Sequence, residues 1–141
     1  GTEDYLPTYL DAAGYTPPEL HYPLDGLSFL PGRPARTEKL LEFGPILRTS
    51  PKGYIGHRGI PTWLSLRTKQ WQYIEFYEKD NNTAVQWKEY YDLTNDPWEL
   101  NNLLYDKNSK SLSNTPDVAA LSARLHKAAA CAGRSGPNPC P

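Results

Sequence analysis

The stretch that decides the fold is "TWLSLRTKQWQYIEFYEKDNNTAVQWKEYYDL", residues 62–93. Side chains of different character alternate along residues 62–68 and again along 71–78, which is typical of β-strands. Asn and Asp gather at residues 79–84, as they do in hairpin turns, and residues 85–93 form the return strand. The pattern predicts a three-stranded antiparallel meander.

Both faces of the predicted sheet carry large apolar or aromatic side chains. We expect one face to hold Leu64, Leu66, Ile74 and Phe76, and the other to hold Trp63, Trp71, Tyr73 and Tyr77. An antiparallel sheet with one solvated face normally alternates apolar with polar residues. We therefore expect a helix to cover one face and the other to be buried against something else.

A C-terminal helix is predicted within "PDVAALSARLHKAAACAG", residues 116–133. Thr115 is expected as its N-cap, Pro116 suits the first helical position, and Gly133 can end it. Its apolar stripe consists of Val118, Leu121, Leu125 and Ala128, which leaves His126 on the surface. The prediction is an α+β fold, with three to four antiparallel strands, the fourth at residues 40–43, packed on this helix.

A short helix is predicted at the other end of the chain, within residues 2–15. Asp4 is expected as its N-cap, and Gly14 suits the position just beyond its end. Leu6, Leu10 and Ala13 are expected to share one face of this helix. Residues 15–36 are rich in proline and read as an ordered surface crossing, because they are too apolar for a free linker.

Composition excludes several classes of function. Lys and Arg number 15 and Asp and Glu 16, so the net charge is -1, and nothing favours nucleic acid or an anionic membrane as partner. No apolar run approaches the length of a transmembrane helix. The chain begins with Gly and contains no Met, so we expect a processed chain or a piece of a longer one.

The two cysteines, Cys131 and Cys140, flank "AGRSGPNP". Zinc sites use shorter spacings and further Cys or His ligands, which this chain lacks. A local disulfide is the favoured interpretation, and it would indicate an oxidising compartment. Two free thiols remain the alternative.

Few residues suggest catalysis. No His is paired with a nucleophile by any motif, and no phosphate-binding loop or HExxH helix is present. His57 and Arg58 lie in a Gly-flanked loop ahead of Trp63, where they could hold an anion or a sugar. Composition alone favours an ordinary surface loop. The acids and amides of residues 80–84 lack the spacing of a calcium loop, so a turn is expected there.

The stretch "YYDLTNDPWELNNL", residues 90–103, admits a calcium site or a structural brace. Asp96, Pro97 and Glu99 read as the N-cap, first and third positions of a helical turn. The residues expected to pack behind this turn on the sheet are Trp98, Leu100, Leu103 and Leu104. The residues therefore favour a brace that needs no metal.

At this stretch the chain resembles a known family. The residues Tyr91, Asp92, Leu93, Asp96, Pro97, Glu99, Asn102 and Leu103 resemble the "YDLxxDPxExxNL" signature of type I, formylglycine-dependent sulfatases, of the arylsulfatase or N-acetylglucosamine-6-sulfatase kind. "EDYLPTYLDAAGYTPPE" (3–19), "LDGLSFLPG" (24–32) and "LSLRTKQWQYIEF" (64–76) resemble further family segments in the same order. The resemblance implies a C-terminal subdomain, divided into residues 1–36 and 37–141.

In that family, a large N-terminal domain carries the formylglycine, the calcium ligands and the catalytic residues. None of these maps onto this chain, so the resemblance implies no catalytic residue and no cofactor here, with calcium and formylglycine expected in the missing domain. Asp92, Asp96, Pro97, Glu99 and Asn102 would then be structural.

The resemblance also implies a role for the chain. It would brace the N-terminal catalytic domain of an enzyme that hydrolyses sulfate esters, and lend loops to a cleft for a sulfated sugar or aryl sulfate. His57, Arg58, Trp63 and Arg67 are the substrate-binding candidates, because Arg binds sulfate and Trp stacks on sugars. A secreted, periplasmic or lysosomal location with a disulfide is implied.

The alternative is a stand-alone carbohydrate- or protein-binding module without catalytic activity. Aromatic residues make up 12% of the chain and include four tryptophans, which would suit such a module. These tryptophans fall on predicted strands and on the brace, where packing also explains them.

Overall fold

The computed structural model describes residues 1–15, 24–43, 61–78, 81–105 and 116–130. The elements are the 3-10 helix η1 (Thr2–Asp4), the helix α1 (Tyr5–Ala12), the strands β1 (Lys39–Phe43), β2 (Trp63–Arg67), β3 (Trp71–Glu78) and β4 (Asn81–Asp92), and the helix α2 (Val118–Ala129). The chain divides into two compact units, one built on Gly1–Thr37 and one spanning Glu38–Ala129. The predicted α+β class is confirmed.

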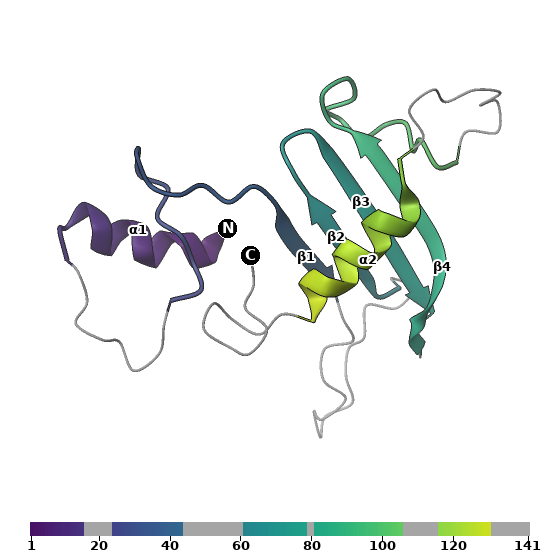
Figure 1. The fold of residues 1–141 in the computed structure, drawn as a ribbon, viewed down its shortest axis with the longest axis horizontal. Helices are drawn as coiled ribbons and strands as arrows, with labels where there is room; N and C mark the ends of the chain where they lie inside the picture. The colour runs from purple at the N-terminus through teal and green to yellow at the C-terminus, as the bar shows by residue number, and fades with distance from the viewer. Residues whose placement is uncertain (16–23, 44–60, 79–80, 106–115, 131–141) are drawn as a thin grey trace. The chain divides into compact units, whose positions relative to one another are not determined.

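The four strands form one antiparallel sheet in the order β1-β2-β3-β4 (Figure 1). The predicted meander is therefore present, and the segment at residues 40–43 supplies the fourth strand. β4 begins at Asn81, so Asn81–Ala84 belong to the strand and not to the turn predicted there. The β3–β4 register shifts on either side of Tyr77, which marks a β-bulge.

The faces of the sheet differ from the expected grouping. Leu66 lies opposite Tyr73, and Leu64 lies opposite Glu75. Directly opposite residues point to the same side of a sheet, so Leu64 and Leu66 share a face with Tyr73 and not with Ile74. The grouping failed because alternation fixes the sides within one strand, whereas the register between strands depends on the turn that joins them.

The core lies between this face and α2, which crosses it (Figure 1). Leu66, Tyr73, Leu125 and Ala128 are buried there, and the half-buried apolar residues around them include Leu40, Leu104, Val118 and Leu121. The predicted helical stripe is thus the packed face. The helix begins at Val118, because the carboxylate of Asp117 accepts the N–H of Ala120 at 3.0 Å, so Asp117 rather than Thr115 occupies the N-cap.

The first unit is built around α1, which ends as predicted. Gly14 has a φ of +67°, its N–H bonds Asp11 O at 3.0 Å, and the N–H of Tyr15 bonds Leu10 O at 2.9 Å. These two bonds are the Schellman arrangement, which a glycine accommodates without strain. Asp4 stands at the N-cap position but makes no capping bond.

The face of α1 that carries Leu6 and Ala13 is not the buried one. Thr8 is the buried residue of the helix, whereas Leu6 is 53% exposed. Residues 24–36 explain this, because they bind the polar side of α1 through Asp4, Thr8 and Asp11. Gly26 fits against η1 only as glycine, since a Cβ there would lie 2.0 Å from the backbone oxygen of Glu3.

Candidate functional site

Two of the four substrate-binding candidates lie on β2, on the face of the sheet opposite α2. Trp63 and Arg67 stand at the two ends of the strand and point to the same side, about 13 Å apart along it. His57 and Arg58 lie outside the described residues. The structure therefore brings Trp63 and Arg67 to one surface and leaves the other two untested.

The Arg67 side chain is held by two partners. Its Nη1 donates to Glu99 Oε1 at 2.5 Å and also to Gln72 Oε1. The arginine side chain is 40% exposed and that of Glu99 29% exposed. The guanidinium is therefore already oriented and its charge is partly neutralised. A sulfate or carboxylate would bind through the N–H groups other than those on Nη1.

Trp63 is partly committed to packing. Its ring lies parallel to that of Phe43 on β1, with centroids 6.3 Å apart and an interplanar angle of 15°. Phe76 on β3 is its cross-strand neighbour. One ring face is thus occupied by an aromatic neighbour, and a sugar would have to use the other face or the edge.

The stretch after β4 forms two successive turns. Residues 96–99 make a tight turn, in which the N–H of Glu99 donates to Asp96 O at 3.1 Å, but the predicted helical turn does not follow it. Asp92 closes the first, accepting the N–H of Thr94 at 3.0 Å and the side-chain amide of Asn95 at 2.7 Å. The Asn95 amide and the nearby backbone N–H groups hold the pKa of Asp92 below its ordinary value against a smaller opposing effect of burial. Asp96 accepts the N–H of Asn101 at 2.8 Å across the second turn.

Glu99 departs most from the prediction. Its φ is +57°, in the left-handed region that residues with a side chain rarely adopt. Its carboxylate binds Arg67 and does not reach back as a cap. Trp98 and Leu100 on either side of it are 81% and 84% exposed, and do not pack on the sheet as expected.

Asn102 fastens the same stretch to the edge of the sheet. Its Oδ1 accepts the N–H groups of Tyr90 and Leu104, both at 3.0 Å, and its Nδ2 donates to Lys88 O at 3.3 Å. The N–H of Leu103 donates to Tyr90 O at 2.9 Å. The side-chain amide thus takes the place of a strand partner for β4.

The feature that sequence reasoning missed is a buried carboxylate under α2. Glu75 is fully buried, and it accepts the hydroxyls of Tyr73 and Tyr77, each at 2.7 Å. His126 Nε2 lies 2.8 Å from Glu75 Oε2, and Lys88 Nζ lies 3.6 Å from Oε1. A Glu in the middle of a strand of large residues was the only sign of it in the sequence.

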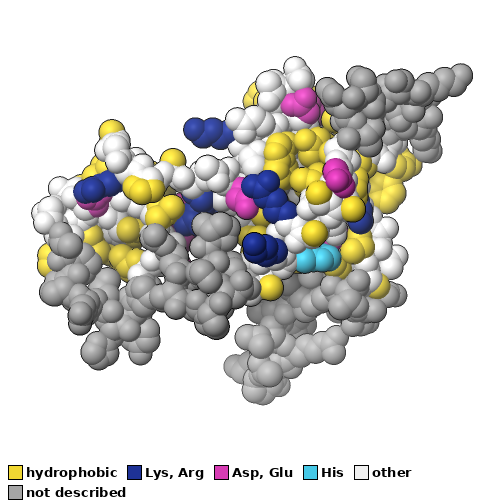
Figure 2. Space-filling view, viewed as in Figure 1, with side chains coloured by type: hydrophobic (Ala, Val, Ile, Leu, Met, Phe, Trp, Pro, Cys, Tyr) yellow, Lys and Arg dark blue, Asp and Glu magenta, His cyan; other side chains and the backbone are white. Residues whose placement is uncertain are grey.

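The hydrogen bonds decide the charge of this carboxyl. Burial raises the pKa of Glu75, but hydrogen bonds from Ser122, Tyr73, Tyr77 and His126 outweigh it and lower the pKa to about 2. Burial and the neighbouring carboxylate raise the pKa of both tyrosines. Figure 2 shows basic side chains and the histidine gathered over α2 on this side of the sheet. The cluster is a buried carboxylate held by hydrogen bonds, with the Lys88 ammonium at its rim, which suits a structural anchor better than a proton-transfer site.

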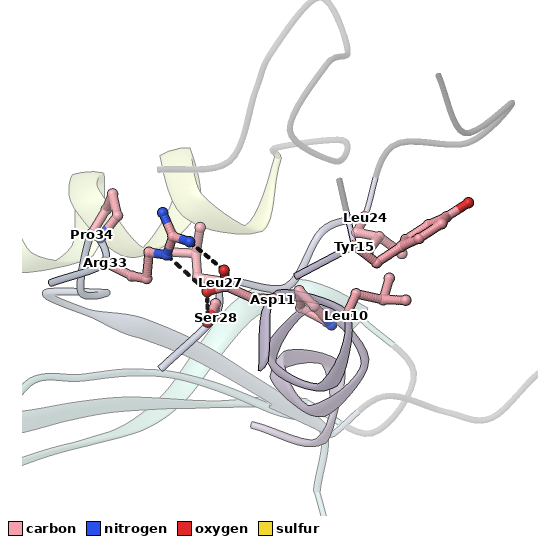
Figure 3. Close-up of a pocket in the computed structure, with 9 residues that line it drawn as sticks. Leu10, Asp11, Tyr15, Leu24, Leu27, Ser28, Arg33 and Pro34 are labelled. Carbon is pink, nitrogen blue, oxygen red and sulfur yellow. Dashed lines mark hydrogen bonds and ion pairs between the residues drawn. The ribbon is translucent and has the colours of Figure 1, made fainter. Parts of the chain in front are cut away.

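The first unit contains a pocket of about 340 Å³. The lining residues are Pro7, Leu10, Asp11, Tyr15, Leu24, Leu27, Ser28, Arg33 and Pro34 (Figure 3). At its edge Arg33 binds both oxygens of Asp11, which also accepts the hydroxyl of Ser28 at 2.6 Å. The Arg33 hydrogen bonds lower the pKa of Asp11, and the two charged groups of the pocket are thus paired with each other.

The described residues contain neither a metal-binding cluster nor a membrane-spanning helix. Within those parts of the chain, no group of three or more His, Cys, Asp or Glu residues could hold a metal ion. No helix among the described segments has the length and apolar character needed to cross a membrane. Cys131 and Cys140, and with them the predicted disulfide, lie outside the described residues.

Comparison with known proteins shows a shared fold. No family model matches the chain, and no curated protein matches it either. Among solved structures, it resembles the structure of BT4656 in complex with its substrate, D-glucosamine-2-N,6-O-disulfate. The two share a fold. The TM-score is 0.54 and the sequence identity is 23%, over 88% of this chain. This chain spans 22% of the length of BT4656, so most of that protein has no counterpart in it.

Proposed function

We propose that the chain is the non-catalytic C-terminal part of an enzyme that hydrolyses sulfate esters. The observation that carries the proposal is the coincidence of two likenesses. The signature of residues 91–103 resembles that of type I sulfatases, and the fold resembles 22% of a protein whose substrate is a disulfated glucosamine. A sulfated sugar is the substrate class that fits both.

Its first task is to brace a catalytic domain. Asp92, Asp96 and Asn102 hold the chain after β4 through hydrogen bonds to backbone N–H groups. The ion pair of Glu99 with Arg67 ties the same stretch to β2. These contacts rigidify a loop that would otherwise be free, and they need no metal ion.

Its second task is to supply one edge of the substrate cleft. Arg67 presents an oriented guanidinium, and Trp63 an aromatic ring, on the sheet face not covered by α2. His57 and Arg58 come shortly before β2 in the sequence and are proposed as members of the same surface. Arg58 and Arg67 would bind sulfate, and Trp63 would contact a sugar ring.

Calcium and formylglycine are proposed to belong to the missing domain. A secreted, periplasmic or lysosomal location remains part of the proposal because of the family resemblance, and a Cys131–Cys140 disulfide because of the spacing of the two cysteines.

The test uses the longer gene product and its Arg67→Ala variant. Sulfate release from D-glucosamine-2-N,6-O-disulfate is measured over a range of substrate concentrations. We expect turnover, with a raised KM and a smaller change in kcat in the variant, as for a residue that binds without reacting. Lys127→Ala, an exposed change on α2, is the control and should leave both constants unchanged. No sulfate release by the longer gene product would refute the proposal.

The second candidate is a sugar- or protein-binding module that acts alone. The exposed Trp98 favours it. Titration of the 141-residue chain with a sulfated oligosaccharide distinguishes the two, because a binding module holds its ligand without a catalytic domain. Micromolar binding by the chain alone would favour the module.

A further inference from the structure

Two large apolar side chains are exposed to solvent on the loop that follows β4. Trp98 is 81% exposed and Leu100 is 84% exposed. The loop projects beyond the end of the sheet (Figure 1), and we call its residues 96–101 the Trp98 turn. Single exposed apolar residues are common on protein surfaces, but two in one short turn form a contact surface that packing within the described chain does not use.

Hydrogen bonds fix the shape of the Trp98 turn. The N–H of Glu99 donates to Asp96 O at 3.1 Å, and the N–H of Asn101 donates to the Asp96 carboxylate at 2.8 Å. The side chain of Asn102 then ties the next residues to β4. An aromatic ring carried on a turn that is already ordered loses little conformational entropy when a ligand binds, so Trp98 is ready to make a contact.

The backbone of Glu99 indicates that the turn does more than connect two segments. Its φ of +57° is one that glycine adopts without strain and that other residues rarely adopt. In this conformation the Glu99 carboxylate lies 2.5 Å from Arg67 Nη1, and the ion pair holds the turn in place. Strained positions of this kind gather at binding sites, where the surrounding structure maintains them.

Trp98 is better suited than Trp63 to receive a sugar ring. One face of the Trp63 ring is covered by Phe43, with centroids 6.3 Å apart, whereas no described aromatic ring stacks on Trp98. Trp98 directly precedes Glu99 in the chain, with about 3.8 Å between their Cα atoms. Its ring is thus carried by the same turn as the carboxylate that orients Arg67. An exposed ring and an oriented guanidinium are therefore joined through one residue.

We infer that the Trp98 turn is a sugar-binding subsite, at which Trp98 stacks on one ring of an oligosaccharide while Arg67 binds a sulfate group on the neighbouring ring. This deepens the proposed function, on which the choice of a sulfated sugar rests. It adds that the preferred ligand is an oligosaccharide and not a single sugar. The sulfate is assigned to Arg67, and the uncharged face of a sugar ring to Trp98.

The composition of the turn favours a sugar over a protein or a membrane. The other exposed residues of the stretch 94–101 are polar or proline: Thr94, Asn95, Pro97 and Asn101. Their hydroxyl and amide groups suit the hydroxyls of a sugar. Two apolar side chains cover far less than the roughly 800 Å² that a partner protein usually buries on each side. The stretch contains no Lys or Arg, which a loop that binds an anionic membrane would need.

A binding experiment on the 141-residue chain tests the subsite without catalysis. The probe is a glucosamine tetrasaccharide with 2-N- and 6-O-sulfate groups, and the dissociation constant is measured by NMR titration of backbone amide signals. Binding should be in the millimolar range, because one ring and one guanidinium make the contact. Trp98→Ala should weaken binding about threefold to tenfold. Tyr9→Ala is the matched control, a 67% exposed ring in the first unit, and should leave binding unchanged.

The unsulfated tetrasaccharide separates the two contacts. It should bind the wild type more weakly than the sulfated probe does, and Arg67→Ala should abolish that difference. The weakening by Trp98→Ala should appear with both probes, because stacking on a sugar ring needs no sulfate.

The kinetics of the longer gene product give an independent measurement. Trp98→Ala should raise KM for the sulfated tetrasaccharide about threefold to tenfold and leave KM for D-glucosamine-2-N,6-O-disulfate unchanged, because a single sugar bound at Arg67 does not reach the ring. A longer protein that releases no sulfate, while the chain still binds through Trp98, would refute only the proposed function. Sulfate release with the same tetrasaccharide KM in variant and wild type would overturn only the subsite.

Three further results would overturn the inference. One is an equal dissociation constant for the wild type and Trp98→Ala. Another is a shift of the amide signals of the Trp98 turn that grows with the concentration of the chain alone, which would indicate a second copy as the partner. The last is a shift with phosphatidylcholine vesicles and none with either tetrasaccharide, which would indicate a membrane contact.

Discussion

Replacing Glu75 by Gln should destabilise the second unit by about 3 kcal/mol. Glu75 is fully buried and accepts two tyrosine hydroxyls at 2.7 Å and the His126 ring at 2.8 Å. The amide of Gln keeps one acceptor oxygen and adds a donor, so one buried tyrosine hydroxyl loses its acceptor, at about 1–3 kcal/mol. The remaining bonds lose their charge assistance, which adds about 1–2 kcal/mol in total.

The rim of the cluster adds little to this figure. The Lys88 side chain is 36% exposed, so solvent screens its attraction to Glu75 and it contributes about 0.2–1 kcal/mol at most. His126 is 52% exposed and enters only through its hydrogen bond. Breaking a buried charge pair costs about 3–5 kcal/mol, and the expected value lies at the lower end because the half-exposed Lys88 can rehydrate.

Urea unfolding followed by tryptophan fluorescence measures the effect. For a unit the size of Glu38–Ala129, a loss of 3 kcal/mol corresponds to a Tm lower by about 12–24 °C. Glu42→Gln is the control, since Glu42 is exposed on β1 and its loss should stay within about 0.5 kcal/mol. Equal stability of the two variants would show that the buried network contributes nothing, and would refute the reasoning.

The remaining predictions concern pH, the turns and the cysteines. The folded-state pKa of Glu75 is about 2, below its ordinary 4.5, so its contribution to stability is full above about pH 5 and is lost as pH falls towards 2. The wild type should therefore lose more unfolding free energy over that range than Glu75→Gln. Equal losses in the two proteins would contradict this. Asp96→Ala removes the acceptor of the Asn101 N–H and should lower the free energy of unfolding by about 0.5–1.5 kcal/mol, with or without EDTA. A loss of stability on adding EDTA in the wild type alone would indicate a bound metal. Gly26→Ala should increase the rate at which a protease cleaves the first unit, because the added Cβ would lie 2.0 Å from a backbone oxygen of η1. An unchanged digestion pattern would contradict the close packing. Alkylation without reduction should leave Cys131 and Cys140 unmodified by mass spectrometry, whereas two adducts would exclude the disulfide.

Local patterns in the sequence predicted the elements well. Alternation identified β2 and β3, and the stripe of α2 proved to be its packed face. Gly14 marked the end of α1, because the left-handed position there suits glycine better than any other residue. In each case the deciding interactions lie within a few residues of one another.

Features set by distant contacts could not be predicted in the same way. The faces of β2 and β3 were grouped wrongly because register depends on pairing between strands. The inward side of α1 was missed because residues 24–36, not an apolar core, orient the helix. Glu99 was read as a capping residue, but an arginine 32 positions away holds its carboxylate.

The candidate site was partly accessible from sequence. Trp63 and Arg67 were singled out by residue type, and the structure places them on one face of β2. Their partners, Phe43 and Glu99, come from separate parts of the chain and decide how much of each side chain a ligand can reach.

Sulfate release from D-glucosamine-2-N,6-O-disulfate, measured side by side on the 141-residue chain and on the longer gene product, tests the central claim most directly. The claim is that this chain supports a sulfate-ester hydrolase without carrying its chemistry. It predicts turnover by the longer protein and none by the chain alone. Turnover by the purified chain that persists through repeated purification would contradict it.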